Sequence, residues 1–405
     1  MKMPLFPPRW IIALVLILLS VFSLSAKDFG ILLDQTGSFE STGDDTELKY
    51  FGTLIPWFST PFGESSDLYI SAGVTVQYEF EKWKIVPELL RTELTLRMAE
   101  NGEIRIGRMP YVDSLGFITK GLFDGVQYSR DLGVGGTLGI GAWYTGFLYK
   151  RNAHITMTEK ELALYDSELK YDDFFNTYFA PRRLIVALDW EHPSLKEFIK
   201  LDVSFIGQFD LSGNDILYHS QYLAAKISLP VNSFVFEAGA CIGLSEMSDR
   251  FQVMFAGELG VAWFLPTLIN DRLSFTGRFS NGTLNDKVVA FVPVTTEFQG
   301  NVLLAKLSGL SMLSLDYTAR LLKSLSVSIS SSYFILSDLG TYQGSINGKE
   351  GHFLGNEFYG LLIWSPVSDL QIRGGGGVFL PSLGNADKSG NILWRIDLNA
   401  VLALF

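Results

Sequence analysis

Apolar and polar residues alternate with a period of two along most of this chain. After Lys200, the apolar residues Leu201, Val203 and Phe205 occupy odd positions and polar residues occupy the even ones. The same alternation recurs in 272–279, 313–320 and 369–373. Because successive side chains of a strand point to opposite faces, each segment predicts a strand with one dry and one wet face.

The length of these segments distinguishes two all-β architectures. A soluble sandwich and a membrane barrel both have one apolar face per strand. Tilted membrane strands need about 9 to 11 residues, whereas soluble strands average about 5 to 6. The sequence therefore predicts a transmembrane antiparallel β-barrel of about 18 strands, with a range of roughly 16 to 18. The expected strands are 29–40, 49–58, 68–81, 86–98, 103–109, 122–130, 137–149, 183–192, 198–210, 217–229, 232–246, 251–265, 271–280, 310–320, 325–336, 354–364, 369–380 and 392–405.

The predicted connections alternate in size. Segments 150–182, 281–309, 337–353 and 381–391 follow odd-numbered strands, whereas most connections after even-numbered strands are tight, such as Asn101-Gly102. Long loops on one rim and short turns on the other are the pattern of outer-membrane barrels. An even strand count then places both termini on the side of the short turns.

The N-terminus carries the features of a signal peptide. Lys2 and Arg9 precede a largely apolar run from Ile11 to Leu24, and Ala26 ends a stretch of small residues. This predicts a signal peptide at 1–26 and a single barrel domain at 27–405, with an uncleaved membrane anchor as the alternative. No later segment approaches about 18 uninterrupted apolar residues, so no second membrane helix is expected.

Composition excludes several functional classes. The net charge of −11 argues against a nucleic-acid partner, because phosphate binding needs clustered Lys and Arg. Cys241 is the single cysteine and cannot form an internal disulfide. The histidines His154, His192, His219 and His352 lie apart, without any recognisable catalytic spacing. We therefore predict no catalytic residues, no metal site, no cofactor and no enzymatic activity.

The last predicted strand ends on Phe405. In it, Arg395, Asp397 and Asn399 occupy one face, and apolar residues occupy the other. This segment resembles the terminal strand that the barrel-assembly machinery recognises in bacterial outer-membrane proteins. The resemblance implies that Phe405 belongs to an assembly signal, and that the assembly machinery, periplasmic chaperones and outer-membrane lipid are partners.

If the apolar faces contact lipid, the polar faces line a lumen. A barrel of this width cannot fill its interior with strand side chains alone, so a channel or a plug is expected. The charged lining is mixed in sign, which suits either mutual ion pairing or contact with polar solutes. The predicted pore-lining residues are Arg91, Glu93, Arg97, Arg105, Asp189, Glu191, Asp202, Glu258, Arg272, Arg278, Asp316, Arg320, Arg373, Arg395 and Asp397.

One pair of motifs carries a family resemblance. Gly107-Arg108, followed by Phe123-Asp124-Gly125-Val126, resembles the G-R and F-D-G-V pair of alginate-export-type porins. That resemblance implies an 18-stranded porin, although this chain lacks the dense arginine ladder of a passage for anionic polymers. The Ser-rich segment from Ser326 to Ser332 also resembles spirochaete-type outer-membrane barrels.

The segment 150–182 is the longest predicted loop, and long loops are usually functional or disordered. A short helix is expected within Thr158–Tyr171. The loop either narrows the barrel mouth, with Tyr171, Asp172, Asp173 and Phe174 toward solute, or caps the outer surface. The apolar segment Val288–Val294 either enters the lumen or forms two further strands.

Together these features predict a porin-like channel in the outer membrane for passive or weakly selective diffusion of small hydrophilic solutes. The alternative is a surface-exposed adhesin or a structural barrel without an open pore. Ion conductance distinguishes the two, because only the first requires a continuous aqueous passage.

Overall fold

The computed structural model describes residues 28–405 except 43, 44, 62, 64, 80, 99, 100, 196, 197, 214–216, 248, 249, 340–350, 388 and 389. The predicted signal peptide, 1–26, lies outside the described residues. Within the described part of the chain, no helix is long and apolar enough to cross a membrane.

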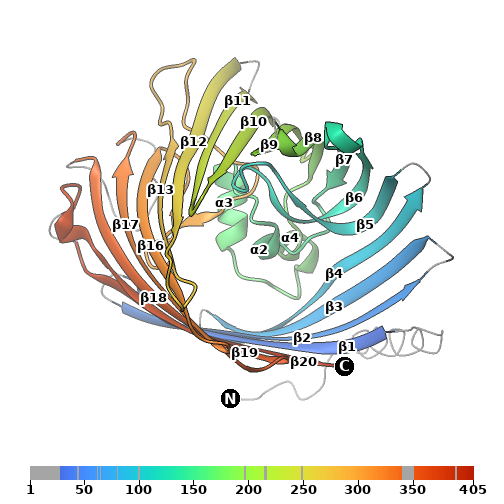
Figure 1. Ribbon diagram of the computed structural model, residues 1–405, viewed down its shortest axis with the longest axis horizontal. Coiled ribbons are helices and arrows are strands. Elements are labelled where there is room, and N and C mark those ends of the chain that lie inside the picture. The colour runs from blue at the N-terminus through green and yellow to red at the C-terminus, as the bar shows by residue number, and fades with distance from the viewer. Residues whose placement is uncertain are drawn as a thin grey trace.

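The chain forms one closed antiparallel barrel of eighteen strands. Each barrel strand pairs with its neighbours in the chain, and β1 pairs with β20 from Ile31↔Leu404 to Glu40↔Arg395, which closes the ring. The prediction of an 18-stranded barrel is confirmed (Figure 1). The barrel strands are β1 Asp28–Thr42, β2 Asp45–Pro61, β3 Ser66–Glu79, β4 Lys82–Met98, β5 Gly102–Val112, β6 Lys120–Asp131, β7 Thr137–Tyr144, β8 Arg183–Leu195, β9 Ile199–Asp210, β10 Tyr218–Val231, β11 Phe234–Met247, β12 Arg250–Phe264, β13 Arg272–Ser280, β16 Leu310–Leu322, β17 Leu325–Leu336, β18 Phe353–Val367, β19 Leu370–Leu380 and β20 Leu393–Leu404.

Alternation along each strand gives the barrel an apolar outer surface. Phe205 in β9 is 50% exposed and Leu315 in β16 is 48% exposed, although both are large and apolar. Ile396 and Leu398 occupy equivalent positions in β20. A contiguous apolar surface of this extent is unfavourable in water and suits lipid.

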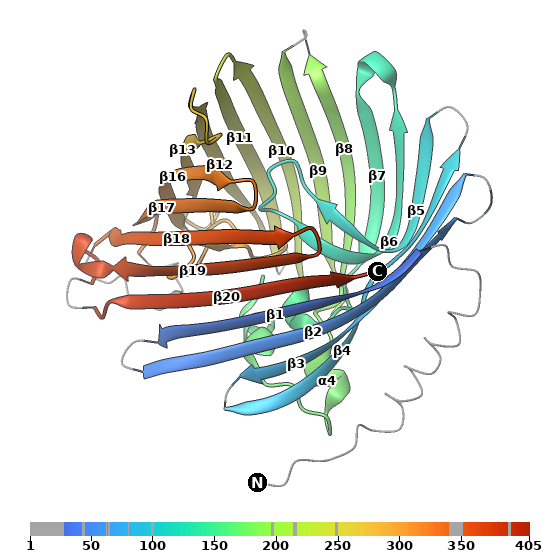
Figure 2. The same ribbon diagram turned by 60° about the horizontal axis from the view of Figure 1, so that its bottom comes forward.

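The connections differ in length as expected, with one correction. Long segments follow β7, β13, β17 and β19, and the connections after even-numbered strands are shorter (Figure 2). The seventh strand was predicted to reach residue 149, but β7 ends at Tyr144. The chain turns there, where Leu148 N donates to Thr145 O at 3.0 Å, and enters the next loop.

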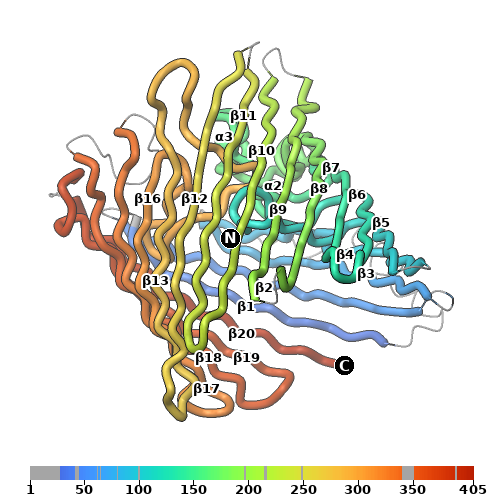
Figure 3. The backbone as a smooth tube through the Cα atoms, turned by 45° about the horizontal axis from the view of Figure 1, so that its top comes forward, coloured from blue at the N-terminus to red at the C-terminus, as the bar shows by residue number. Residues whose placement is uncertain are grey.

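Three segments fold into the ring of strands and are called here the inner segments (Figures 1 and 3). They are the tip of the β5–β6 hairpin (113–119), the β7–β8 loop (145–182) and the β13–β16 loop (281–309). The β7–β8 loop holds α2 Lys150–Ala153, α3 Glu159–Asp166 and α4 Phe174–Tyr178, and the β13–β16 loop holds β14 Phe298–Gln299 and β15 Ala305–Lys306. Single 3-10 turns occur at η1 Gly133–Gly135 and η2 Pro381–Leu383.

The structure decides between the alternatives for two loop segments. Val288 and Val289 pair with β12 at Val253, and the segment then enters the barrel, where Phe291 and Val294 are fully buried. It adds no barrel strand. The short strands β14 and β15 pair only with each other among the described residues. The helix expected within Thr158–Tyr171 is α3, which ends at Asp166 because Ser167 adopts an extended backbone.

The inner segments build an apolar core inside the barrel. Phe117, Ile155 and Phe291, one from each segment, belong to one buried cluster. Inward side chains of β5 to β12, such as Tyr222 and Met254, complete it. The polar face of β9 is therefore not wet throughout, because Ser204 and Gln208 are almost fully buried.

Candidate functional site in the barrel lumen

The three inner segments meet one another inside the barrel. Thr156 Oγ1 and Thr296 Oγ1 lie 2.6 Å apart, which joins the β7–β8 loop to the β13–β16 loop. Thr296 N also donates to His154 O at 2.8 Å, and Val294 N donates to Ile118 O at 2.8 Å. Contacts between segments so distant in sequence fix where the lumen is narrowed.

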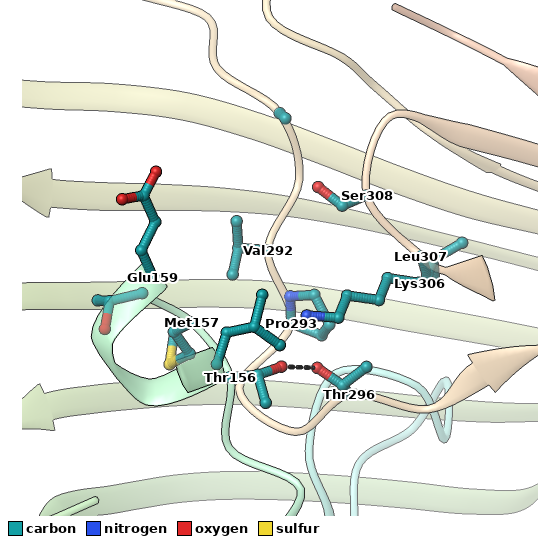
Figure 4. A pocket seen from close by; sticks show the side chains of 12 residues that line it. Thr156, Met157, Glu159, Val292, Pro293, Thr296, Lys306, Leu307 and Ser308 are labelled. Atoms are coloured by element: carbon teal, nitrogen blue, oxygen red, sulfur yellow. Dashed lines mark hydrogen bonds between the residues drawn. The ribbon is translucent and has the colours of Figure 1, made fainter. Parts of the chain in front are cut away.

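A cavity of about 180 Å³ lies at this junction (Figure 4). Its lining combines hydroxyl groups, such as those of Thr156 and Ser308, with the apolar groups of Pro293 and Leu307. The side chain of Lys306 extends along it, and burial lowers the pKa of this amine below its ordinary value. The arrangement can hold a small polar solute, since it offers both donors and an apolar wall.

The hairpin tip is stabilised by one buried carboxylate. Asp113 accepts hydrogen bonds from the backbone N–H groups of Leu115, Gly116, Ile118 and Thr119 at 2.8 to 3.0 Å. Gly116 N also donates to Asp113 O at 3.1 Å, whereas the other three N–H groups have the carboxylate as their partner. The carboxylate therefore holds a tight turn within the barrel.

A buried ion network anchors the β7–β8 loop to the wall. The side chain of Arg183 in β8 is 1% exposed, pairs with Glu161 of α3 and lies 3.2 Å from Asp210 in β9. Glu161 also completes a capping box with Thr158, the residue that precedes α3. The start of α3 is thereby fixed both by its own sequence and by the strand behind it.

The same loop contacts the outer ends of β3 and β4. Lys84 pairs with Glu168 at 2.5 Å, and Arg151 pairs with Glu79 at 2.8 Å. The hydrogen bond from Lys84 is the main reason why the pKa of Glu168 lies below its ordinary value. These ion pairs hold the loop to the ends of β3 and β4, several strands away from Arg183 in β8.

The G-R and F-D-G-V motifs lie next to each other on β5 and β6. Arg108 Nε and Nη2 donate to the two carboxylate oxygens of Asp124 at 2.9 and 2.7 Å. Gly107 has a φ of 116°, and a Cβ at this position would lie 2.0 Å from Thr92 O. The glycine permits the close approach, and the bidentate pair holds the two strands where the hairpin leaves the wall.

The predicted pore-lining residues form separate ion-paired groups. Arg91 Nε lies 2.8 Å from Glu93, and Arg105 lies 3.7 Å from the same carboxylate. Arg278 pairs with Glu258 at 3.0 Å, and further pairs are Arg395–Asp397, Arg97–Asp67, Lys200–Glu191 and Lys200–Asp202. Mutual pairing braces the wall at these positions.

Other predicted lining residues have local polar partners. Asp189 accepts from Ser204 and Tyr111, and Asp316 accepts from Ser314 at 3.0 Å. The remaining three are dispersed: Arg272 lies opposite Thr318 in the ladder, Arg320 donates to Lys323 O, and Arg373 donates to Gln371.

The expected constriction residues and the observed junction are different groups. Tyr171 bonds to the backbone of Ile85 in β4, and Phe174 stacks on Tyr178. Asp172 and Asp173 are exposed. The contact between loops is made instead by residues that sequence reasoning missed, namely His154, Thr156 and Thr296, and Lys306 lines the cavity beside them. Only the Thr158–Glu161 capping spacing could have marked the neighbouring helix start.

Comparisons with known proteins give a fold. No family model and no curated protein matches the sequence. Solved structures from Pseudomonas aeruginosa do match. OccK2 (OpdF) in complex with glucuronate has a TM-score of 0.62 at 13% identity, with 93% of this chain and 97% of that chain covered. This is the fold of a bacterial outer-membrane porin. OccK3 (OpdO) has a TM-score of 0.61 at 11% identity, covering 95% and 97%. The outer membrane protein opdK has a TM-score of 0.58 at 12% identity, covering 93% and 98%.

Proposed function

We propose that this porin-like barrel is an outer-membrane channel for passive or weakly selective diffusion of small hydrophilic solutes. One observation carries the proposal: the inner segments cover β3 to β13 and, through 302–305, the ends of β17 to β19, and they leave a polar wall in the remaining parts of β16 to β20. In that wall, Ser328, Arg373, Asp397 and Asn399 are inward and at least partly exposed. A partly exposed polar lining in a closed barrel suits an aqueous passage.

The charges of this passage support weak selectivity. Arg395 pairs with both Glu40 and Asp397, and Lys49 pairs with Glu40 at 2.6 Å. Because opposite charges alternate along the wall, neither cations nor anions meet a continuous field of one sign. OccK2 holds glucuronate, whereas the balanced wall of this chain favours small polar solutes over acidic polymers.

Export and assembly follow from the same proposal. The N-terminal segment directs secretion, and the periplasmic chaperones and barrel-assembly machinery act before insertion into outer-membrane lipid. Phe405, the proposed assembly signal, packs edge-on against Trp57 with ring centroids 6.0 Å apart. Deleting Phe405 should reduce insertion in cells without changing the conductance of refolded protein.

The test is conductance in planar bilayers. Refolded protein should pass ions in discrete steps, and removal of residues 158–175 should raise the step size because α3 no longer narrows the lumen. That deletion also removes Glu161, but the guanidinium of Arg183 keeps Asp210 at 3.2 Å and Tyr218 O at 2.7 Å as partners. Glu161→Gln with the loop intact is the matched control, because it weakens the same ion pair without removing the loop.

Two outcomes would count against the proposal. A verified folded barrel that never conducts would favour the adhesin or structural alternative. Conductance that is unchanged after loop removal would retain the channel but place its narrowest point elsewhere.

A further inference from the structure

β4 and β5 separate halfway along their length. Their ladder runs from Met98↔Gly102 to Thr92↔Arg108 and stops. From Lys82 to Arg91, β4 pairs only with β3. At about 3.3 Å per residue this leaves on the order of 30 Å of β4 without a strand on one side.

The missing partner lies in the lumen. Beyond Gly107 the β5–β6 hairpin leaves the wall, and β6 pairs with β7 only from Asp124 onward. The hairpin tip instead contacts β9, farther round the wall, where Ser114 N donates to Ser204 Oγ at 3.0 Å. The wall opens between β4 and β5 because the hairpin folds inward at this position, and this gap is called here the split.

The free edge of β4 is covered by side chains. Tyr171 Oη bonds to both N and O of Ile85, Tyr178 Oη donates to Pro87 O at 2.6 Å, and Arg108 donates to Leu89 O. Pro87 has no N–H to satisfy, as suits an edge strand. These partners meet the requirement that backbone groups at membrane depth be covered by protein or water.

A cavity of about 420 Å³ occupies the split. Extending the β4–β5 register would pair Leu90 with Pro110 and Glu88 with Val112, and all four line the cavity instead. The rest of the lining combines Gly121, Leu122 and Leu148 with the polar residues Arg108, Lys120, Asn152 and His154. Its volume lies within the range of about 300 to 1,000 Å³ that is typical of small-molecule sites.

Two exposed aromatic residues of the β7–β8 loop lie beside the split. Phe147 is 62% exposed and follows β7 closely, and its carbonyl accepts from Arg108. Tyr171 is 55% exposed although it is bonded to the β4 edge. Aromatic rings exposed beside a membrane-spanning edge are well placed at the boundary between lipid and water.

We propose that this split is a lateral portal that binds a single-chain amphiphile at the junction of the lumen and the outer membrane. The proposal goes beyond solute diffusion, because the site lies beside the free edge of β4 and shares only His154 with the contact between the loops. The acyl chain lies along Leu90, Pro110, Val112 and Leu122, and the polar head reaches the groups around Arg108 and Asn152. Both signs of charge are present there, so the head is recognised mainly by hydrogen bonds.

The test uses a stearic acid analogue with a photoreactive group in mid-chain. The full barrel is reconstituted in phosphatidylethanolamine–phosphatidylglycerol vesicles, irradiated and digested, and labelled peptides are identified by mass. Label should concentrate in 82–91 and 108–122, and excess unlabelled stearate should displace it. Val112→Trp fills the cavity and should reduce labelling about tenfold, equivalent to about 1.4 kcal/mol of binding.

Controls separate this proposal from channel function. Leu138→Trp adds the same ring to the lipid-facing surface of β7, at an exposed position, and should leave labelling of the split unchanged. Leu90→Trp repeats the blockade from the other strand, and the electrophoretic mobility of each variant verifies folding. Labelling spread evenly over the barrel, or unaffected by both blocking variants, would overturn the portal even if the protein conducts. Specific labelling of a non-conducting barrel would overturn the channel and retain the portal.

Discussion

The two halves of the barrel have the same strand pattern but different interiors. In β9 to β12, inward positions hold Ser204, Tyr222, Cys241 and Met254, all buried beneath the inner segments. In β17 to β20, one end of the strands is covered as well, since Phe334 and Phe379 are buried with Leu303, but inward groups such as Ser328 and Asp397 remain partly exposed. The comparison shows that an inward polar side chain is exposed to the lumen only where no inner segment covers it.

The physical reason is the cost of burying polar groups. In the filled half each one needs a partner, as in the pair of Ser204 with Asp189 at 2.6 Å. In the polar half, water can supply missing partners, so side chains there tolerate change. The predictions below test this difference, from the largest expected effect to the smallest.

Arg183→Met should produce the largest loss of stability. It leaves Glu161 and Asp210 buried without their cation, which costs about 3 to 5 kcal/mol for a buried pair. Urea titration with an electrophoretic mobility readout measures the change. Arg182→Met, at the exposed neighbouring position, should alter unfolding little. Equal losses of stability in the two variants would contradict the conclusion that the inward groups of this half are buried and need their partners.

Arginine substitutions should distinguish the two halves face by face. Phe205→Arg and Leu315→Arg both put charge into lipid and should cost about 2 to 4 kcal/mol near the midplane. On the inward face, Ser204→Arg should cost about 1 to 3 kcal/mol by overpacking. Thr318→Arg, at a partly exposed position, should change stability by less than about 0.5 kcal/mol.

The same folding assay in lipid measures all four variants. If Ser204→Arg is as mild as Thr318→Arg, then water reaches β9 and the comparison between the halves fails.

Gly107→Ala should destabilise the position where β5 leaves the wall. The new Cβ would lie 2.0 Å from Thr92 O at a φ of 116°, a strain on the order of 1 to 3 kcal/mol. Gly374→Ala in β19 meets no atom within 4 Å and serves as the control. Thermal unfolding should separate the two variants, and identical midpoints would mean that the hairpin geometry adapts freely.

Acidification should weaken the ion pair between Lys84 and Glu168, which helps to hold the β7–β8 loop to β4. The pKa of Glu168 in the folded protein is lowered from its ordinary value of 4.5. The stabilisation of the loop by this carboxylate is therefore fully present above pH 4.5, and it is lost as the pH falls through the lower pKa of the folded state. Hydrogen exchange in 167–178 should then increase. In Glu168→Gln the exchange should already be faster at neutral pH and lack this transition. If hydrogen exchange in the wild-type protein does not depend on pH apart from the intrinsic rate, these ion pairs do not stabilise the loop.

The sequence by itself determined most of the strands, their outward faces and a count of about eighteen. Those features depend on local alternation, as at Leu313 and Leu315, because the pleat fixes a period of two whatever the rest of the chain does. The length of the β7–β8 loop and the presence of a helix in it were likewise predicted from local composition.

Only the tertiary structure decided what lies inside the ring. The contacts of Thr156 with Thr296 and of Ile118 with Val294 join segments more than a hundred residues apart, and no local pattern encodes their meeting. Pro110 is a local indication of the split between β4 and β5, because proline cannot donate a hydrogen bond to a neighbouring strand. The cause of the split is global, since the hairpin gains a buried apolar core in the lumen that the wall position cannot provide.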